Sequence, residues 1–131
     1  MIVEHARLTP NLALDEEEGY ALRMNTGEVC ILYTTVGSAD QARAMAQQLV
    51  EQQCVACAHI FPAGQSIYCW EGKLVEENEV VVFLKTKEVL KAEAMDQLAS
   101  IHPYECPCIL SIDLNAANDP YVDWISTVLG V

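Results

Sequence analysis

Two short segments of this chain concentrate side chains that could bind a metal ion or a small molecule. One lies in residues 66–74 and the other in residues 102–107, and each includes a Gly or Pro that constrains the backbone. Imidazole, carboxylate and thiolate groups ligate metals, while Tyr and Trp rings offer surfaces on which a ligand can stack. The side chains concerned are Tyr68, Trp70, His102, Tyr104, Glu105 and Cys106. The rest of the chain is interpreted as the scaffold that positions them.

The second segment predicts a metal site. His102 directly precedes Pro103, which fixes the backbone there, and neutral imidazole is a common ligand for copper and zinc. A stable site needs about three or four protein donors, so one imidazole is insufficient. Glu105 and Cys106 follow closely in the chain and add O and S donors. We therefore expect His102, Glu105 and Cys106 to bind metal; the alternative is that His102 caps helix carbonyls and Glu105 is solvated.

Aromatic residues from both segments predict a ligand cleft. Tyr68 and Trp70 precede a hairpin turn, Tyr104 lies in the second segment, and Lys85 ends the returning strand. Such a cleft suits a small ligand that stacks and carries a carboxylate or phosphate. The alternative is that these rings pack at a subunit interface, where aromatic residues are enriched. The segment Glu76-Glu77-Asn78-Glu79, which follows the turn, is interpreted as a solvated hairpin end.

Two closely spaced cysteine pairs also invite a zinc or redox interpretation, Cys54 with Cys57 and Cys106 with Cys108. A redox Cys-x-x-Cys pair works at a helix N-terminus, where the dipole lowers the thiol pKa, whereas Cys54 follows a predicted helix. We therefore interpret Cys54 and Cys57 as buried structural residues. A four-cysteine zinc site would need the two pairs to be adjacent in space, which the sequence leaves open.

Composition and motifs argue against several functional classes. The 131 residues carry a net charge of −12, which disfavours nucleic acid and anionic lipid and favours cations. No apolar run approaches the ~20 residues of a membrane helix, and residues 1–7 lack the order of a signal peptide. The chain has no Gly-rich phosphate loop, nucleophile elbow or His-Glu-x-x-His motif. We predict a cytoplasmic, non-enzymatic protein that binds neither nucleic acid nor membrane and keeps its cysteines reduced.

Hydrophobic periodicity predicts the order of the elements. Three helices are predicted. The first begins at Ser38, where Gln41 completes a capping box, and the second begins near Leu90. The third begins at Asp119, which precedes Pro120. The second helix ends at Pro103. Four strands are predicted, over residues 29–33, 55–70, 80–84 and 109–114. The second is interrupted by a bend at 62–64, so that its two parts cover 55–61 and 67–70.

The order β-α-β-β-α-β, followed by a C-terminal helix, predicts an α+β, ferredoxin-like sandwich over residues 27–131, with both main helices on one face of the sheet. Residues 1–26 are predicted to be an acidic, flexible extension. The run Val80–Leu84 is apolar at every position, so we expect it to be buried on both faces. Another subunit would then cover the open face, and the alternative is that the C-terminal helix alone covers it.

The motifs identify a family. From about residue 29 to residue 129 the chain resembles the CutA family, which is named for divalent-cation tolerance, whereas residues 1–26 lie outside the resemblance. The residues that carry it are Thr34-Thr35, Val55-Ala56-Cys57-Ala58-His59-Ile60, Ser66-Ile67-Tyr68-Cys69-Trp70-Glu71-Gly72-Lys73, Lys85-Thr86, His102-Pro103-Tyr104-Glu105 and Tyr121-Val122-Asp123-Trp124-Ile125.

The resemblance implies a ferredoxin-like subunit in a homotrimer, with an architecture like that of the PII signalling proteins, and a role in tolerance of divalent metals, copper in particular. It also implies copper ligands that this chain has partly lost. Tyr33 stands where a family Cys is a candidate ligand, and Ile101 with His102 stands where the family has consecutive histidines. Cys108 replaces a usual Glu, and a usual Gly is missing from 115–118.

The leading hypothesis is therefore a trimeric protein that binds or responds to divalent metal through His102, Glu105 and Cys106. The runner-up is a PII-like signalling or adaptor trimer whose inter-subunit cleft binds a small metabolite or a partner chain. A third, weaker hypothesis is a purely structural trimerisation module. Cations near the cleft discriminate between the first two, because a nucleotide site would need more than Lys73, Lys85 and Lys87.

Overall fold

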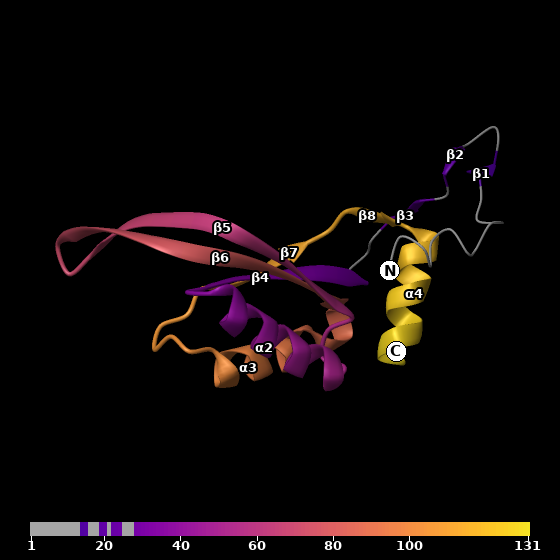
Figure 1. The fold of residues 1–131 in the computed structure, drawn as a ribbon. Helices are drawn as coiled ribbons and strands as arrows, with labels where there is room; N and C mark the ends of the chain where they lie inside the picture. The colour runs from indigo at the N-terminus through magenta and orange to yellow at the C-terminus, as the bar shows by residue number, and fades with distance from the viewer. Residues whose placement is uncertain (1–13, 16–18, 21, 25–27) are drawn as a thin grey trace.

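A four-stranded antiparallel sheet with two helices on one face forms the centre of the computed structural model, which describes residues 14–15, 19–20, 22–24 and 28–131 (Figure 1). The strands run in the order β5-β6-β4-β7. Their bounds are Val29–Val36 for β4, Cys57–Trp70 for β5, Lys73–Lys87 for β6 and Ile109–Asp113 for β7. The helices are α2 (Ala39–Glu51) and α3 (Lys91–Ile101), the latter preceded by the 3-10 turn η1 (Glu88–Leu90). The predicted ferredoxin-like fold is confirmed.

The C-terminal helix α4 (Asp119–Leu129) stands beside one end of the sheet (Figure 1). Its N-cap is Asn118, one residue before the predicted Asp119. The short strand β8 (Ala116–Asn118) directly precedes α4 and pairs with β3 (Leu22–Met24) of the N-terminal segment. In the same segment β1 (Leu14–Asp15) pairs with β2 (Gly19–Tyr20). Apart from these short strands, the extension predicted over 1–26 lies outside the described residues. None of the described helices has the length and apolarity of a membrane span.

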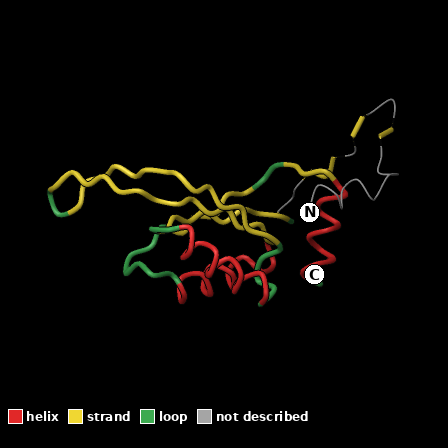
Figure 2. Tube along the Cα trace, in the orientation of Figure 1, coloured by secondary structure: helices red, strands yellow, loops and turns green. Residues whose placement is uncertain are grey.

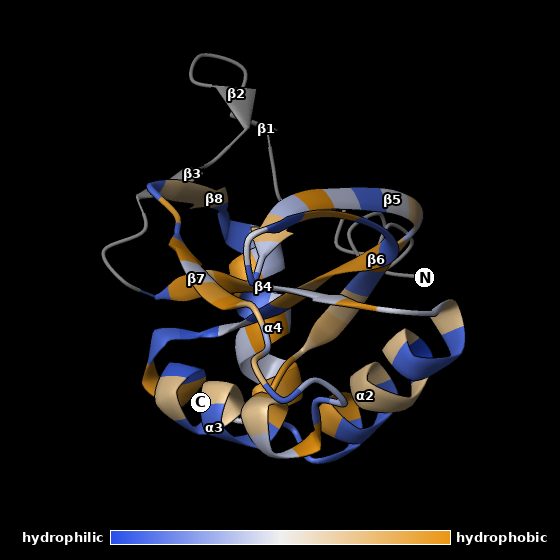
Figure 3. Ribbon diagram, turned by 90° about the vertical axis from the view of Figure 1, so that its left-hand side faces the viewer, coloured by the Kyte–Doolittle hydropathy of each residue, from blue (hydrophilic) through white to orange (hydrophobic). Residues whose placement is uncertain are grey.

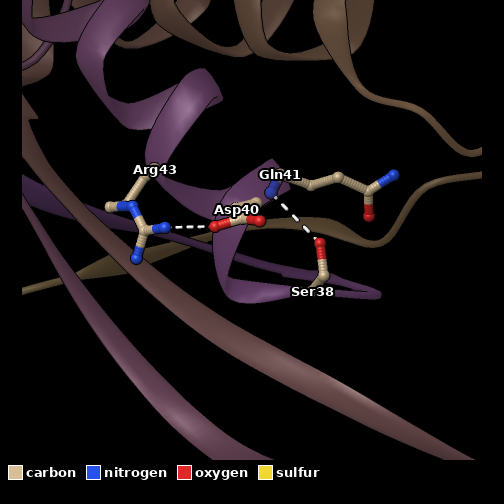
Figure 4. Close-up of polar contacts among 4 residues, drawn as sticks. All are labelled: Ser38, Asp40, Gln41 and Arg43. Carbon is tan, nitrogen blue, oxygen red and sulfur yellow. Dashed lines mark hydrogen bonds and ion pairs between the residues drawn. The ribbon is translucent and has the colours of Figure 1, made fainter.

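The start of α2 follows from its capping residue. Ser38 adopts an extended backbone, and its Oγ accepts a hydrogen bond from the Gln41 backbone N–H at 3.1 Å (Figure 4). This bond satisfies one of the N–H groups that the first turn of a helix leaves without an intrahelical partner. Asp40 in the first turn forms an exposed ion pair with Arg43 (Figure 4). The apolar periodicity of α2 buries Ala42, Met45, Ala46 and Leu49, whereas Val50, which continues the same pattern, is 37% exposed.

Two apolar clusters hold the layers together. The larger joins the sheet to α2 and α3, with Leu32, Val82, Leu84, Leu49 and Leu98 among its members. The smaller seats α4 at the end of the sheet and contains Val29, Ala56, Val122, Ile125 and Leu129. Helix α4 therefore packs against the end of the sheet rather than across its open face.

The β5–β6 hairpin projects beyond the rest of the sheet (Figures 1 and 2). Strand β4 pairs with β6 only over Val80–Lys87, so residues 73–79 pair with β5 alone. The turn places Glu71 and Gly72 at φ values of 50° and 80°, the left-handed conformation that two-residue hairpin turns require. The bend predicted at 62–64 is a register shift between Phe61 and Gly64. Residues 73–79 are thus free to form the wall of a pocket instead of the sheet interior.

Gly64 allows the close approach of β5 and β6 at this bulge. A Cβ there would lie 2.7 Å from the Glu79 carbonyl oxygen, which is backbone and cannot rotate away. We expect Gly64→Ala to lower the free energy of unfolding by about 1–3 kcal/mol, measured by chemical denaturation. Gly37→Ala is the control, because its Cβ would meet only the flexible Gln41 side chain at 3.3 Å and the Tyr104 hydroxyl at 3.7 Å. Equal stability of the two variants would contradict this account.

The sheet face opposite α2 and α3 is apolar, and α4 does not cover it. In register across the strands, Leu110 lies beside Tyr33, and Tyr33 beside Phe83. We call this surface the apolar sheet face; its members are Ile31, Tyr33, Phe61, Val81, Phe83, Leu110 and Ile112. Figure 3 shows the hydrophobic stretches on β6 and β7. In the single chain Val81 and Phe83 lie on this face and are only partly buried, so burial of Val80–Leu84 on both faces by another subunit stays a prediction. The alternative that the C-terminal helix alone covers the face is wrong.

Candidate functional site

A pocket of about 760 Å³ lies between the projecting hairpin and the loop that follows α3. We call it the hairpin pocket. Strands β5 and β6 supply one wall, and the loop supplies the other. The lining residues are Thr35, Tyr68, Trp70, Val75, Glu77, Glu79, Tyr104, Glu105, Cys106 and Cys108. The two segments singled out in the sequence, far apart along the chain, therefore meet in one cavity.

Glu79 joins the two walls. Its Oε2 accepts a hydrogen bond from the Tyr104 hydroxyl at 2.8 Å, and its side chain is buried. Burial acts to raise the pKa of Glu79, but hydrogen bonds from Ser66, Tyr104 and Thr35 outweigh burial and hold the pKa below its ordinary value. Glu79 is therefore an ionised carboxylate at neutral pH. Burial and the contact with Glu79 raise the pKa of Tyr104. The Tyr104 hydroxyl therefore stays protonated and donates the hydrogen bond to Glu79.

His102 positions the loop from behind the pocket wall. Its Nδ1 accepts a hydrogen bond from the Tyr104 backbone N–H at 3.1 Å, which assigns the ring proton to Nε2. Nε2 lies 3.0 Å from the Thr35 carbonyl oxygen and 3.1 Å from Thr34 Oγ1. Since Thr34 Oγ1 donates to the Cys108 carbonyl at 2.7 Å, it can accept from Nε2. Both ring nitrogens are thus engaged within the protein.

Burial keeps His102 neutral. It lowers the pKa of the imidazole, while the Thr35 carbonyl and the Glu79 carboxylate act in the opposite direction and only partly offset burial. The neutral tautomer matches the hydrogen bonds, since a second ring proton would face the Tyr104 N–H. His102 therefore acts as a structural connection between β4 and the loop at neutral pH.

The structure brings together only part of the predicted metal set. Glu105 and Cys106 line the hairpin pocket, whereas His102 lies behind it. Within the described part of the chain, no three His, Cys, Asp or Glu side chains are grouped so that they could hold a metal ion. Tyr33, which the family resemblance was expected to place at a former ligand position, lies on the apolar sheet face with its ring centroid 5.9 Å from that of Phe83. Ligation by His102, Glu105 and Cys106 stays a prediction.

The predicted ligand cleft assembles without its cation. Tyr68, Trp70 and Tyr104 all line the hairpin pocket. Lys85 lies elsewhere, near the α4 end of β6, with its Nζ 5.4 Å from the centroid of the Tyr121 ring. No basic residue is among the lining residues in the described part of the chain. The pocket is aromatic and acidic, not aromatic and basic as the sequence suggested.

Two acidic residues of the pocket were missed because residues 76–79 were interpreted as a solvated hairpin end. Glu79 is in fact buried, and Glu77 lines the pocket. Burial and a hydrogen bond to Glu77 raise the pKa of Tyr68, so Glu77 also supports an aromatic wall. The signal available in the sequence was the period-2 spacing of Val75, Glu77 and Glu79, which places them on one side of a strand.

Comparison with known families agrees with this fold. A family described as CutA1 divalent ion tolerance protein matches residues 30–128, from β4 into α4. The chain belongs to the CutA family. The segments that build the hairpin pocket all lie inside the matched region, so the pocket is part of the CutA domain and not of the N-terminal segment.

CutA relatives occur in distant organisms. The chain is 35% identical over 95 residues to the divalent-cation tolerance protein CutA of Pyrococcus horikoshii, a match that covers 72% of this chain and 92% of that protein. It is 32% identical over 119 residues to human protein CutA, covering 91% of this chain and 64% of the human protein. Among solved structures, CutA from Synechococcus elongatus gives a TM-score of 0.79 at 32% identity, covering 83% of this chain and 96% of that one. A CutA structure from Archaeoglobus fulgidus, described as periplasmic, gives a TM-score of 0.74 at 31% identity, and the match covers 77% of this chain and 98% of that one.

The cysteines of this CutA chain fall into two environments. Cys54 and Cys57 are buried, as predicted for structural residues, and the Cys57 Sγ lies 3.4 Å from the Tyr121 hydroxyl. Cys106 and Cys108 are exposed and line the hairpin pocket. The two pairs therefore contribute to different parts of the fold and do not form a four-cysteine site.

Proposed function

We propose that this CutA protein acts as a non-enzymatic, cytoplasmic homotrimer that binds divalent metal, copper in particular. The names of its relatives support a role in divalent-cation tolerance. Exposed thiols such as Cys69 and Cys106 suit a reducing compartment. The observation that carries the proposal is the placement of Glu105 and Cys106 in an acidic pocket of a chain with net charge −12.

The apolar sheet face supports the trimer. Phe61, Leu110 and Ile112 are 41%, 54% and 42% exposed, and the Phe61 ring on the edge strand β5 contacts Phe83 with the ring centroids 5.2 Å apart. A contiguous apolar surface of this kind is typical of a protein interface. In the proposed assembly the same face of each subunit packs around a common axis, which buries these side chains without any further element of the chain.

Metal binding in this proposal begins with Glu105 and Cys106. Their carboxylate and thiolate groups suit a borderline cation such as copper or zinc, and Cys108 lies in the same pocket. His102 can join them only by giving up its hydrogen bonds to the Thr35 carbonyl and the Tyr104 N–H. Because the described residues of one subunit group too few donors, we expect the remaining ligands to be water or to come from a neighbouring subunit.

Titration of the reduced protein with zinc and copper, followed by native mass spectrometry, tests this function. We expect Glu105→Gln combined with Cys106→Ser to weaken metal affinity at least about tenfold, because losing even a residue that only orients a ligand weakens a metal site by about 10- to 100-fold. Cys69→Ser is the matched control, since Cys69 is an exposed thiol of β5 that does not line the pocket.

Unchanged affinity in the double variant would refute metal binding at this loop. Equal loss in Cys69→Ser would instead show that metal binds exposed thiols without selectivity.

The hairpin pocket also favours a second candidate function, that of a signalling or adaptor trimer that binds a small molecule. Its volume of about 760 Å³ lies within the range of about 300–1,000 Å³ typical of small-molecule sites. Tyr68, Trp70 and Tyr104 supply apolar ring surfaces, and the polar groups converge on Glu79. This combination of an apolar wall with a few polar groups is typical of a ligand site.

A further inference from the structure

The charge of the hairpin pocket restricts the ligands that it can accept. Glu77, Glu79 and Glu105 line it, and no lysine or arginine does among the described residues. The nearest titratable base that faces Glu79 is His102, which burial keeps neutral. A ligand carrying phosphate or carboxylate would meet like charges on several sides, whereas a cation would be attracted. The ligand class expected when Lys85 was placed in the cleft is therefore reversed.

The aromatic walls add a second, independent preference. Tyr68 and Trp70 are separated by one residue on β5, so they project from the same side of the hairpin. Tyr68 is 37% exposed to solvent and Trp70 is 56% exposed, so a ligand can reach both rings. Tyr104 faces the pocket from the loop. The face of an aromatic ring attracts an organic cation through its quadrupole, most strongly for Trp. Rings and carboxylates in one cavity are the two features that recognise ammonium groups.

Glu79 adds a buried negative charge. Its hydrogen bonds come from the hydroxyl groups of Ser66, Tyr104 and Thr35, which stabilise the carboxylate without neutralising it. At 8% exposure the charge is shielded from bulk water and acts at short range within the pocket. A cation bound between Glu79 and the rings would supply the missing positive charge.

We propose that the hairpin pocket binds a small organic cation, an amine or quaternary ammonium compound with a short apolar body. This inference rests on the second candidate function, because it names the ligand class of that pocket. It does not depend on metal binding. The volume of about 760 Å³ exceeds what a bare metal ion requires and accommodates an organic molecule.

An NMR titration of the full reduced chain with choline tests the proposal, using 3,3-dimethylbutan-1-ol as the uncharged isostere. We expect choline to shift the Trp70 indole N–H signal saturably and to bind at least about fivefold more tightly than the isostere. The Trp124 indole, on α4 and outside the pocket, serves as the internal control.

Variants separate the two contributions to affinity. We expect Trp70→Leu, which keeps an apolar side chain but removes the ring, and Glu77→Gln each to weaken choline binding about threefold or more. Because Trp70→Leu removes the reporter indole, the backbone N–H signal of Tyr104, which also lines the pocket, follows binding in the variants. Glu76→Gln is the matched control, because it removes the same charge from the adjacent residue of β6, which does not line the pocket. Choline affinity should be unchanged in this variant.

Three results would overturn the proposal in distinguishable ways. Equal affinity for choline and its isostere would leave a small-molecule pocket but refute the cation preference. Saturable binding of inorganic phosphate in place of choline would show that the ligand class is anionic. If none of the three probes moved the Trp70 signal, the cation site and the second candidate function would both fail.

Discussion

Replacing Leu110 by Asp is expected to convert the proposed trimer into folded monomers. Leu110 is 54% exposed in the single chain and lies beside Tyr33 on the apolar sheet face. In the monomer the new carboxylate would stay hydrated, so the subunit should fold normally. In the trimer it would be buried at each copy of the interface, at an effective cost of several kcal/mol per ion. Since each 1.4 kcal/mol is a factor of about ten in an equilibrium constant, the assembly should dissociate.

Sedimentation velocity and circular dichroism together measure this outcome. The control is Ser111→Asp, which introduces the same charge at the adjacent position of β7; successive residues of a strand face opposite sides, so its side chain lies away from the apolar sheet face. We expect Ser111→Asp to remain trimeric. An intact Leu110→Asp trimer would show that the apolar sheet face is not the interface and that the subunits associate through another surface.

The second large effect is expected on stability: His102→Ala should lower the free energy of unfolding by about 2–4 kcal/mol. The substitution leaves the buried Thr35 carbonyl and the Tyr104 N–H without their partner, and each buried unsatisfied group costs about 1–3 kcal/mol. It also leaves a cavity behind the loop. Chemical denaturation at a fixed protein concentration measures the loss, since assembly itself contributes to apparent stability.

His102→Asn is the informative companion variant. Its side-chain oxygen can accept from the Tyr104 N–H as Nδ1 does, so we expect stability between that of the wild type and His102→Ala. Two variants of equal stability would mean that the cavity, not the hydrogen bond, dominates. Because His102 supports the fold, its removal would alter metal affinity indirectly, and the metal test therefore uses Glu105 and Cys106.

The same residue predicts a pH dependence of stability. Burial lowers the pKa of His102 in the folded protein below its ordinary value of 6.5. Between the two values the unfolded chain binds a proton that the folded chain does not, so stability is complete above about pH 6.5 and falls as the pH decreases. Glu79, whose folded pKa lies below 4.5, adds a further loss at lower pH, as the unfolded carboxyl protonates first.

Denaturation midpoints measured from pH 7.5 down to pH 5 test this assignment. The decrease just below pH 6.5 should be present in the wild type and reduced in His102→Asn. A decrease of the same size in both proteins would assign the titration to another group.

Local patterns in the sequence were sufficient for the main helices and the four strands of the central sheet and for their order, but not for the short strands β3 and β8 or the outer half of β6. The Ser38 cap, the stripe of α2, the Glu71-Gly72 turn and the end of α3 at Pro103 each depend on residues within a few positions of one another. Local hydrogen bonding and periodicity determine such features, so they can be read without the fold. The sequence also predicted that Tyr68, Trp70 and Tyr104 line one cleft, because aromatic residues are concentrated in the two segments that contain them, and all three line the hairpin pocket.

Tertiary structure decided the chemistry of the pocket. Lys85 and Trp70 lie on paired strands, but only the register of the long hairpin shows that Lys85 pairs with Cys57, far from the pocket. Glu79 looked like part of a solvated turn, and its burial arises because the loop after α3 closes over it through Tyr104. His102 looked like a free ligand until the Thr35 carbonyl and the Tyr104 N–H were placed beside its two nitrogens. Composition and spacing identify which groups are present, whereas the partners that set charge and availability come from segments that only the folded chain brings together.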